Sequence, residues 1–273
     1  MQDRFRQRIA LPFCLFLALF IGMGFAFAED EAAFVSPTRN PNAPEYNEKK
    51  PEDLQAEQLV ADAFVLMEAE SGDILFERNA DKLMYPASTT KIMTALLALQ
   101  FCDLNEEVNV NESAVDLPAD ASVVPFKKGE IVTMQDAIYG MMLRSGNDAA
   151  NAIAEHIAGS QQAFVDLMNS AAQMIGMTNT HYVNPHGYHD PEHYTTARDM
   201  ALLTREALQY EAFRKIVGTQ QYALSGTGAN PSRMITNSNL LLDPNSTHYY
   251  YPYAIGVKTG FHSQSGYTLV AAA

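Results

Sequence analysis

Residues 86–99 read PASTTKIMTALLAL, in which a Ser-x-x-Lys pattern, Ser88 to Lys91, stands between a proline and an apolar run. Proline biases the residue before it towards extended geometry, and the apolar run is typical of a buried helix, so we expect Ser88 near a helix N-terminus. Side chains three positions apart on a helix share one face, with Cβ atoms roughly 5–6 Å apart. The Lys91 amine is therefore expected within reach of the Ser88 hydroxyl, as a base beside a nucleophile.

Two further short patterns follow: residues 145–147 read SGN and residues 258–260 read KTG. Each pattern is common alone, the first as a loop or helix cap and the second as a solvated turn. In this order, Ser-x-x-Lys, Ser-x-Asn and Lys-Thr-Gly form the constellation of enzymes that open a D-alanyl amide or a β-lactam ring. Because the patterns are far apart in the sequence, they can meet only across a folded domain.

The first residues indicate where the chain works. Arginines precede an apolar stretch that closes with Ala26-Phe27-Ala28, a small-x-small cleavage signature, so we interpret residues 1–28 as a signal peptide for export. An uncleaved membrane anchor is the alternative, since the stretch approaches spanning length. Residues 29–55 are polar, charged and proline-rich, which predicts a disordered linker. The catalytic domain is then expected over residues 56–273.

Composition limits the remaining possibilities. The net charge of −14 argues against nucleic acid and anionic lipid surfaces as partners. With 47% hydrophobic residues, the chain can bury the core of one large domain or of two closely packed subdomains. Cys14 falls in the signal, so cleavage leaves Cys102 without an internal disulfide partner, and its place after an apolar helix favours buried packing.

The apolar periodicity predicts two strand regions around a helical middle. Residues 63–68 and 73–77, on either side of Glu70-Ser71-Gly72, are typical of a β-hairpin. Between about 90 and 225 the chain is mostly helical, with spacing near 3.6 at residues 133–143, 149–158, 161–176 and 197–209. Strand character returns at residues 253–259 and 266–270.

Five segments in order, residues 86–94, 143–150, 184–187, 196–201 and 256–260, resemble the serine D-alanyl-D-alanine carboxypeptidases, the low-molecular-mass penicillin-binding proteins. The resemblance covers roughly residues 60–273. It implies an α+β fold of the β-lactamase/transpeptidase type: an antiparallel sheet flanked by helices, with an inserted, mostly helical subdomain. The active site is then expected at the junction of the two parts.

The resemblance implies roles for the residues of the first two patterns. Ser88 is the nucleophile, Ser145 relays a proton to the departing nitrogen, and Asn147 holds the substrate amide and Lys91. A serine hydroxyl needs an unprotonated neighbour, and Lys91 is the leading candidate for that base. Partial desolvation and a second cation, Lys258, are expected to favour its neutral form.

The Lys-Thr-Gly segment is expected to bind substrate. A terminal carboxylate needs a cation and a hydroxyl donor, which Lys258 and Thr259 provide. Gly260 has no side chain, so a substrate backbone can lie against that strand. By resemblance, the oxyanion is held by the backbone N–H groups of Ser88 and Phe261.

The activity expected on these grounds is a serine-type D-alanyl-D-alanine carboxypeptidase. Such an enzyme removes the terminal D-alanine from peptidoglycan stem peptides in the periplasm or at the outer cell surface, through an acyl-enzyme that β-lactams mimic as covalent inhibitors. No metal or other cofactor is expected. Two alternatives are a β-lactamase, whose class A pattern uses Ser-Asp-Asn and a separate Glu, and a non-catalytic penicillin or peptidoglycan binder.

A metal-dependent alternative rests on residues 181–193, which hold four histidines, Asp190 and Glu192. Zinc enzymes of unrelated fold also cleave D-alanyl-D-alanine, but the spacing here matches no trusted zinc motif. Histidines in loops near polar clefts are ordinary. A chelator would distinguish the two chemistries.

In the resembled family, one more strand follows the Lys-Thr-Gly hairpin and lies between its second strand and the N-terminal hairpin. The sequence stops at Ala273. We therefore expect a C-terminally truncated form of a longer chain, which lacks this strand and an arginine near the substrate carboxylate. The strands at residues 63–66 and 268–270 are then either separated or bonded directly. Membrane association through the signal region or a C-terminal segment stays open.

Overall fold

A computed structural model describes residues 59–273, which fall within a unit formed by residues 39–273. The signal peptide expected at residues 1–28 and the linker expected at 29–55 lie outside the described residues. Within residues 59–273, no helix combines the length and the apolar character needed to cross a membrane.

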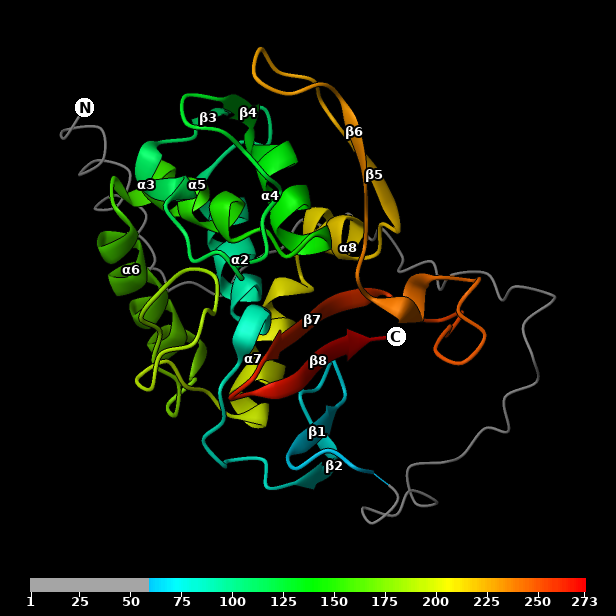
Figure 1. Cartoon of the computed structure of the whole chain (residues 1–273). Coiled ribbons are helices and arrows are strands. Elements are labelled where there is room, and N and C mark those ends of the chain that lie inside the picture. Colours follow the sequence, from blue (N-terminus) through cyan, green and yellow to red (C-terminus); the bar gives the residue numbers. More distant parts are fainter. Residues whose placement is uncertain (1–58) are drawn as a thin grey trace, which may run out of the picture. The chain divides into compact units, whose positions relative to one another are not determined.

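The buried helix expected after Ser88 is the centre of the fold (Figure 1). A short 3₁₀ helix, η3 (Ala87–Thr90), leads into α2 (Lys91–Phe101), whose first eight residues are all buried. Five further helices contact α2: α4 (Met134–Leu143), α5 (Asn147–Ala158), α6 (Gln161–Ile175), α7 (Ala197–Ala207) and α8 (Glu211–Val217). The apolar run therefore builds the core on which the other elements pack.

Capping residues fix the ends of these helices. Thr133, Ser160 and Thr196 precede α4, α6 and α7, and each hydroxyl accepts a hydrogen bond from a backbone N–H three residues later. Gly159 and Gly176 end α5 and α6 with φ of +79° and +90°, the left-handed region that glycine enters without strain. These signals explain why the four helices expected from periodicity are confirmed to within two residues at each end.

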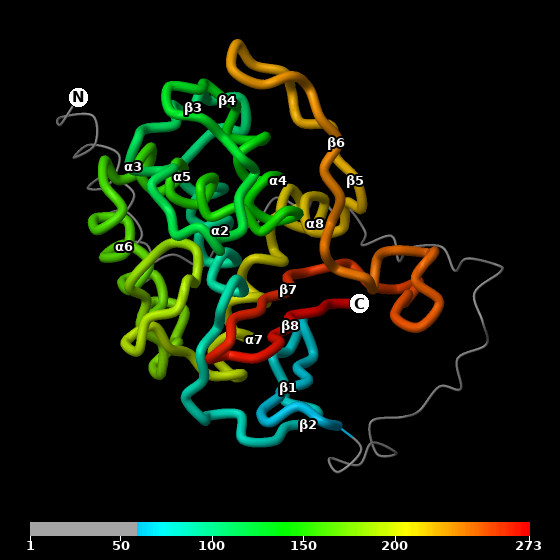
Figure 2. The backbone as a smooth tube through the Cα atoms, in the orientation of Figure 1, coloured from blue at the N-terminus to red at the C-terminus, as the bar shows by residue number. Residues whose placement is uncertain are grey.

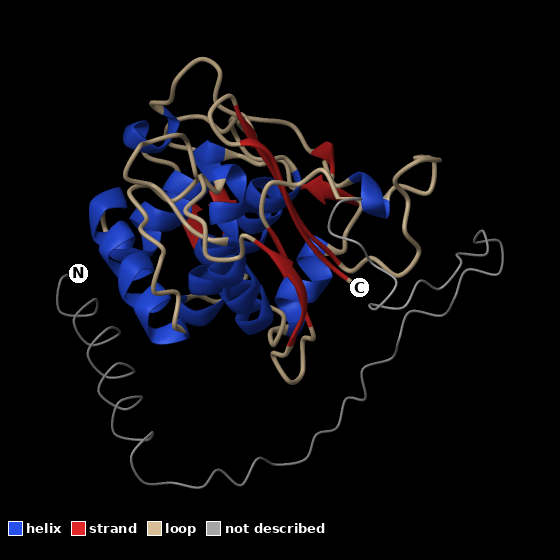
Figure 3. Cartoon of the chain, turned by 90° about the horizontal axis from the view of Figure 1, so that it is seen from below, coloured by secondary structure: helices blue, strands red, loops and turns tan. Residues whose placement is uncertain are grey.

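The strands pair as four antiparallel ladders of two strands each in the described residues: β1 (Phe64–Met67) with β2 (Ile74–Arg78), β3 (Glu107–Asn109) with β4 (Ile131–Thr133), β5 (Gln221–Leu224) with β6 (Arg233–Thr236), and β7 (Gly256–His262) with β8 (Gly266–Ala272). Two short elements, α3 (Glu112–Val115) and η4 (Leu240–Leu242), complete the set. Most helices lie on one side of the long β7–β8 hairpin (Figure 3). The α+β class is confirmed.

Some boundaries differ from the expectation. β7 begins at Gly256 rather than at residue 253, because the Ala254 N–H donates to the Tyr251 carbonyl at 3.0 Å and closes a turn. The hairpin β3–β4 interrupts the helical middle, and the hairpin β5–β6 begins at its end. Their strands have only three or four residues, too few for a periodic pattern to be recognised.

The N-terminal and C-terminal hairpins lie near each other but form separate ladders in the described residues (Figure 2). Of the two arrangements expected for β1 and β8, the structure has the separated one. Helix α7 contacts both strands. The single continuous sheet that the resemblance implies is therefore present as two hairpins within residues 59–273.

Candidate active site

The Ser-x-x-Lys pattern folds as expected from its spacing. Ser88 lies in η3, half-buried, and Lys91 is the first residue of α2, fully buried. Lys91 Nζ donates to Ser88 Oγ at 3.0 Å, to Asn147 Oδ1 at 2.8 Å and to the His186 carbonyl at 2.7 Å. One amine thus joins Ser88, the start of α5 and the loop before α7.

The electrostatics of the site favour neutral amines. Burial lowers the pKa of Lys91 well below its ordinary value, the charge of Lys258 lowers it further, and Asp148 opposes both. Burial also lowers the pKa of Lys258, to about 7. Both causes expected for the Lys91 shift, desolvation and the second cation, are therefore present.

Lys258 connects β7 to the Ser-Gly-Asn segment. Its Nζ donates to Ser145 Oγ at 3.2 Å and to the Thr259 carbonyl at 2.8 Å. Ser145 stands between α4 and α5 with φ of +61°, and Ala87, just before Ser88, has φ of +49°. Residues other than glycine are strained in this region, and such strain persists where the surroundings over-determine the backbone. The two strained positions therefore lie at Ser145 and directly before Ser88, the residues that contact Lys258 and Lys91.

Two glycines allow the turn that carries Ser88 to pack tightly. A Cβ atom at Gly260 would lie 2.9 Å from the Ser88 nitrogen, and one at Gly187, where φ is +83°, would overlap the Ala87 carbonyl. Real Cβ atoms do not approach backbone so closely. The close packing of β7 against η3 therefore requires glycine at position 260. This reason is separate from the room for a substrate that is expected there from the sequence.

Asp148 lies in the segment 143–150 that resembles the family, and its carboxylate organises one wall of the site. It accepts a hydrogen bond from the Val124 N–H at 2.9 Å and another from the Phe126 N–H at 2.9 Å. Burial raises its pKa, and these backbone donors oppose that rise. The Asn147 N–H adds a bond to the Ser122 carbonyl at 2.8 Å, so the start of α5 holds the loop between α3 and β4.

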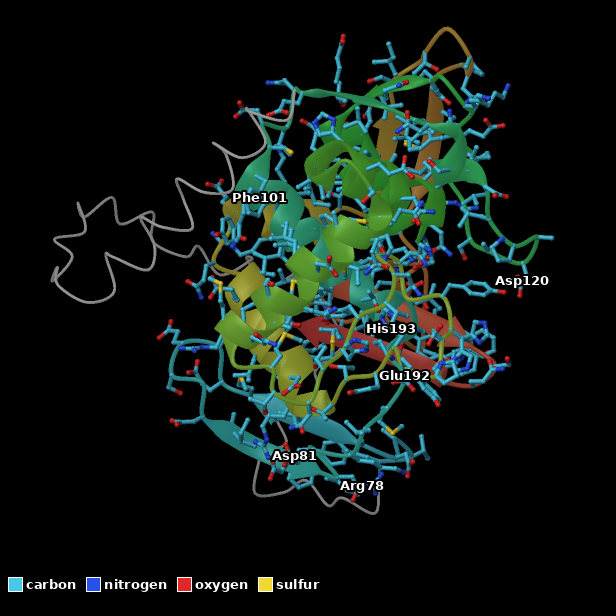
Figure 4. The ribbon with its side chains drawn as sticks, turned by 90° about the vertical axis from the view of Figure 1, so that its left-hand side faces the viewer. Arg78, Asp81, Phe101, Asp120, Glu192 and His193 are labelled. Atoms are coloured by element: carbon cyan, nitrogen blue, oxygen red, sulfur yellow. The ribbon has the colours of Figure 1, made fainter. Side chains whose placement is uncertain are left out.

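A cleft opens at Ser88 between this loop and the β7–β8 hairpin. It is lined by residues from five parts of the chain: Ser88, Asp120, Ala121, Ser122, Asn147, Gly187, Tyr188, Phe261 and His262. Asp120 lies at the outer end of its loop and accepts a hydrogen bond from the Tyr188 hydroxyl at 2.9 Å (Figure 4). Thr259 Oγ1 lies 2.7 Å from Ser238 Oγ. No motif in the sequence pointed to Asp120, Tyr188 or Ser238.

The structure gathers every position singled out by the motifs into this region. Hydrogen bonds join Lys91 to Ser88 and to Asn147, and Lys258 to Ser145. The remaining candidates, Thr259, Gly260 and Phe261, follow Lys258 on β7, with Phe261 lining the cleft.

Three of the four histidines considered as zinc ligands, His181, His186 and His193, form hydrogen bonds with backbone groups. His193 Nδ1 accepts from the Val183 N–H at 3.2 Å and Nε2 lies 2.9 Å from Thr90 Oγ1, so the ring is neutral with its proton on Nε2. Burial lowers the pKa of His193 to about 3. His186 Nδ1 likewise accepts from the Tyr188 N–H at 3.1 Å. Within residues 59–273, no group of three metal-binding side chains forms in this loop.

Comparison with known proteins gives consistent relatives. The family model described as D-alanyl-D-alanine carboxypeptidase matches residues 48–273. D-alanyl-D-alanine carboxypeptidase DacF of Bacillus subtilis (strain 168) is 35% identical over 219 residues, which covers 78% of this chain and 54% of that protein. D-alanyl-D-alanine carboxypeptidase DacC of Escherichia coli (strain K12) is 36% identical over 238 residues, which covers 81% of this chain and 55% of that protein.

The solved structures agree with the sequence matches. A mutant of the Streptomyces K15 DD-transpeptidase is similar with a TM-score of 0.71 and 32% identity, over 78% of this chain and 85% of that one. The chain spans about half the length of the curated relatives it matches. With the family model matched across the whole described part, the chain belongs to the D-alanyl-D-alanine carboxypeptidase family.

Proposed function

We propose that the chain is a serine-type D-alanyl-D-alanine carboxypeptidase, which removes the terminal D-alanine of a peptidoglycan stem peptide through an acyl-enzyme on Ser88. The observation that carries this proposal is the 3.0 Å contact between Ser88 Oγ and the buried amine of Lys91. The names of the relatives support the substrate class.

Lys91 is the proposed base for acylation. A neutral amine has two N–H groups and one lone pair, and Asn147 Oδ1 and the His186 carbonyl can accept the two N–H groups. The lone pair is then left for the Ser88 hydroxyl proton. As Lys91 takes this proton, Ser88 Oγ attacks the carbonyl carbon of the penultimate D-alanine.

The oxyanion formed by this attack is assigned to the backbone N–H groups of Ser88 and Phe261, both at the cleft. Preorganised donors of this kind are typically worth about 2.7–4 kcal/mol each in the transition state. The tetrahedral species then collapses, and the C–N bond to the terminal D-alanine breaks. The leaving nitrogen takes, through Ser145, the proton that Lys91 had accepted from Ser88, so Lys91 is neutral again before deacylation. Ser145 Oγ is itself held by Lys258 Nζ at 3.2 Å.

Lys258 and Thr259 are the proposed clamp for the substrate carboxylate. A buried amine with a pKa of about 7 is only partly charged near neutral pH. An arriving carboxylate favours the charged form and raises that pKa. Water then attacks the acyl-enzyme while Lys91 accepts a proton from it. Lys91 passes this proton to Ser88 Oγ as the ester bond breaks, and the shortened peptide is released.

Export belongs to the same proposal, because the proposed substrate lies outside the cytoplasmic membrane. We assign residues 1–28 to a signal peptide and residues 29–55 to a linker that spaces the domain from it. β-Lactams are proposed to acylate Ser88 as mimics of the D-alanyl-D-alanine end. Association with the membrane is proposed to depend on segments outside residues 56–273.

One assay separates the proposal from its alternatives. D-Alanine release from a diacyl-Lys-D-Ala-D-Ala peptide is measured beside β-lactam hydrolysis, with Ser88→Ala as the inactive control. The carboxypeptidase releases D-alanine and turns over β-lactam slowly. Rapid β-lactam turnover would point to a β-lactamase, and a penicillin adduct without D-alanine release would point to a binder. Activity lost to a chelator but not to penicillin would point to metal chemistry.

A further inference from the structure

A second cluster of reactive side chains lies away from the active site. It consists of Cys102, Glu106 and His156, and we call it the Cys-Glu-His triad. The thiol sulfur, a carboxylate oxygen and an imidazole nitrogen all lie within 4.8 Å of one another. His156 Nε2 is 3.2 Å from Glu106 Oε2, and these two side chains are about one quarter exposed, at 24% and 26%. The triad is therefore half-buried and open to solvent on one side.

The carboxylate of the triad is held in position by the backbone. The Asp103 N–H donates to Glu106 Oε1 at 3.0 Å, which leaves Oε2 directed at His156. The Met134 N–H donates to the Glu106 carbonyl at 2.8 Å and fastens this loop to the start of α4. Partners that orient a ligand in this way are typical around bound metals.

Two helix ends favour positive charge at the triad. Cys102 is the C-cap of α2, and His156 stands in the last turn of α5. The two helices begin side by side, because Lys91 at the start of α2 bonds Asn147 at the start of α5. Their last turns also come together at the triad, so the two helices run in the same direction. Their carbonyl ends, each carrying a partial negative charge, therefore meet there. Figure 4 shows Phe101, the last residue of α2, on the opposite side from Asp120 of the cleft.

We propose that the Cys-Glu-His triad binds a divalent cation of the zinc class, with water as the fourth ligand. Zinc bonds of about 2.0–2.3 Å in a tetrahedron place ligand atoms roughly 3.2–3.8 Å apart. The separation of 3.2 Å between His156 and Glu106 already fits. The Cys102 sulfur lies within 4.8 Å of both ligand atoms, so the proposed site requires it to move closer when the metal binds. Thiolate with imidazole suits zinc, whereas Mg²⁺ and Ca²⁺ take oxygen ligands. Binding transfers the Cys102 proton, and any second imidazole proton of His156, to solvent.

The ordinary alternative is an ion pair between Glu106 and protonated His156 with no metal. Such a pair needs only two of the three side chains. The alternative predicts that Cys102 reacts equally with and without zinc. The metal site predicts protection, because a coordinated thiolate is withheld from an alkylating reagent.

A metal at the triad would join the far ends of the two helices that carry Lys91 and Asn147. The eleven residues of α2 separate the triad from Lys91 by roughly 16 Å, at 1.5 Å per residue. A cation there does not touch the reacting atoms. It is expected to raise the melting temperature, because a ligand that binds only the folded state stabilises it, while penicillin acylation of Ser88 keeps its rate.

The test uses the full chain after chelator treatment. Zinc binding is measured by titration calorimetry, and Co²⁺ is used as a spectroscopic probe for a thiolate-to-metal charge-transfer band. We expect about one zinc per chain, at least tenfold weaker binding in Cys102→Ser and His156→Gln, and unchanged binding in the control His248→Gln, whose ring is exposed. The Co²⁺ band should vanish in Cys102→Ser.

A second readout covers variants that fail to fold. In the wild-type chain, alkylation of Cys102 is located by peptide mass spectrometry with and without zinc. Zinc is expected to slow alkylation at least tenfold. Equal alkylation rates, zinc affinity that survives both triad variants, or Co²⁺ binding without the band would each overturn the proposal.

Discussion

Asp148 offers a sharp test of how the site is built. Its buried carboxylate accepts the backbone N–H groups of Val124 and Phe126, both of which belong to buried residues. Asp148→Ala leaves these two donors without their partner. A buried donor left unsatisfied costs about 1–3 kcal/mol, so the gross loss in unfolding free energy is about 2–6 kcal/mol. Relief from burying the carboxylate offsets part of this, and we expect a net loss of about 2–4 kcal/mol.

The measurement is urea unfolding of Asp148→Ala beside Asp166→Ala, an exposed aspartate of α6 that serves as the control. The control is expected to change the unfolding free energy by less than about 0.5 kcal/mol. Because the loop held by Asp148 also lines the cleft, penicillin acylation should slow in Asp148→Ala under conditions where it is still folded. Equal stability losses in the two variants would refute the anchoring role.

Three further predictions concern the reacting groups. Lys258→Ala should weaken turnover of substrates with a free terminal carboxylate far more than turnover of their amidated analogues, whereas Lys91→Ala should abolish acylation by both; equal losses in the Lys258 variant would exclude the clamp. The pKa of Lys258 is about 7 in the folded chain, below its ordinary value of 10.5, so the unfolded chain binds more protons between these pH values. The free energy of unfolding should therefore rise from pH 7 to 10 through Lys258, and this rise should be absent in Lys258→Met. Parallel pH profiles of the two proteins would contradict this. Gly260→Ala should slow acylation of Ser88 by at least tenfold, and Gly228→Ala, where a Cβ meets nothing within 4 Å, should not.

Local features of the site were predictable from sequence. Ser88 and Lys91 are one helical turn apart, so their spacing alone indicated the contact that is observed at 3.0 Å. The caps and apolar periodicity likewise indicated the long helices. The contact of Lys258 with Ser145 joins segments far apart in the sequence. No local pattern predicts it, and the expectation that the two segments meet came from the resemblance of the ordered motifs to a known family.

Other features depend on tertiary packing that leaves little trace in the sequence. The His186 carbonyl accepts from Lys91 through its backbone, so residue type carries no signal for it. Ser238 reaches Thr259 from a separate loop. Asp148 follows the Ser-Gly-Asn segment directly, but it accepts hydrogen bonds from backbone N–H groups of the loop between α3 and β4. Backbone donors carry no residue-type signal, so the sequence does not indicate these bonds. Short hairpins such as β3–β4 hold too few residues for a periodic pattern.

Covalent labelling by penicillin tests the central claim most directly. The full chain is treated with penicillin and digested, and the adduct is located by mass spectrometry in wild type and in Ser88→Ala. The account predicts one adduct per chain, on the peptide that contains Ser88, and none in Ser88→Ala. An adduct on another residue, or one that persists in Ser88→Ala, would contradict it.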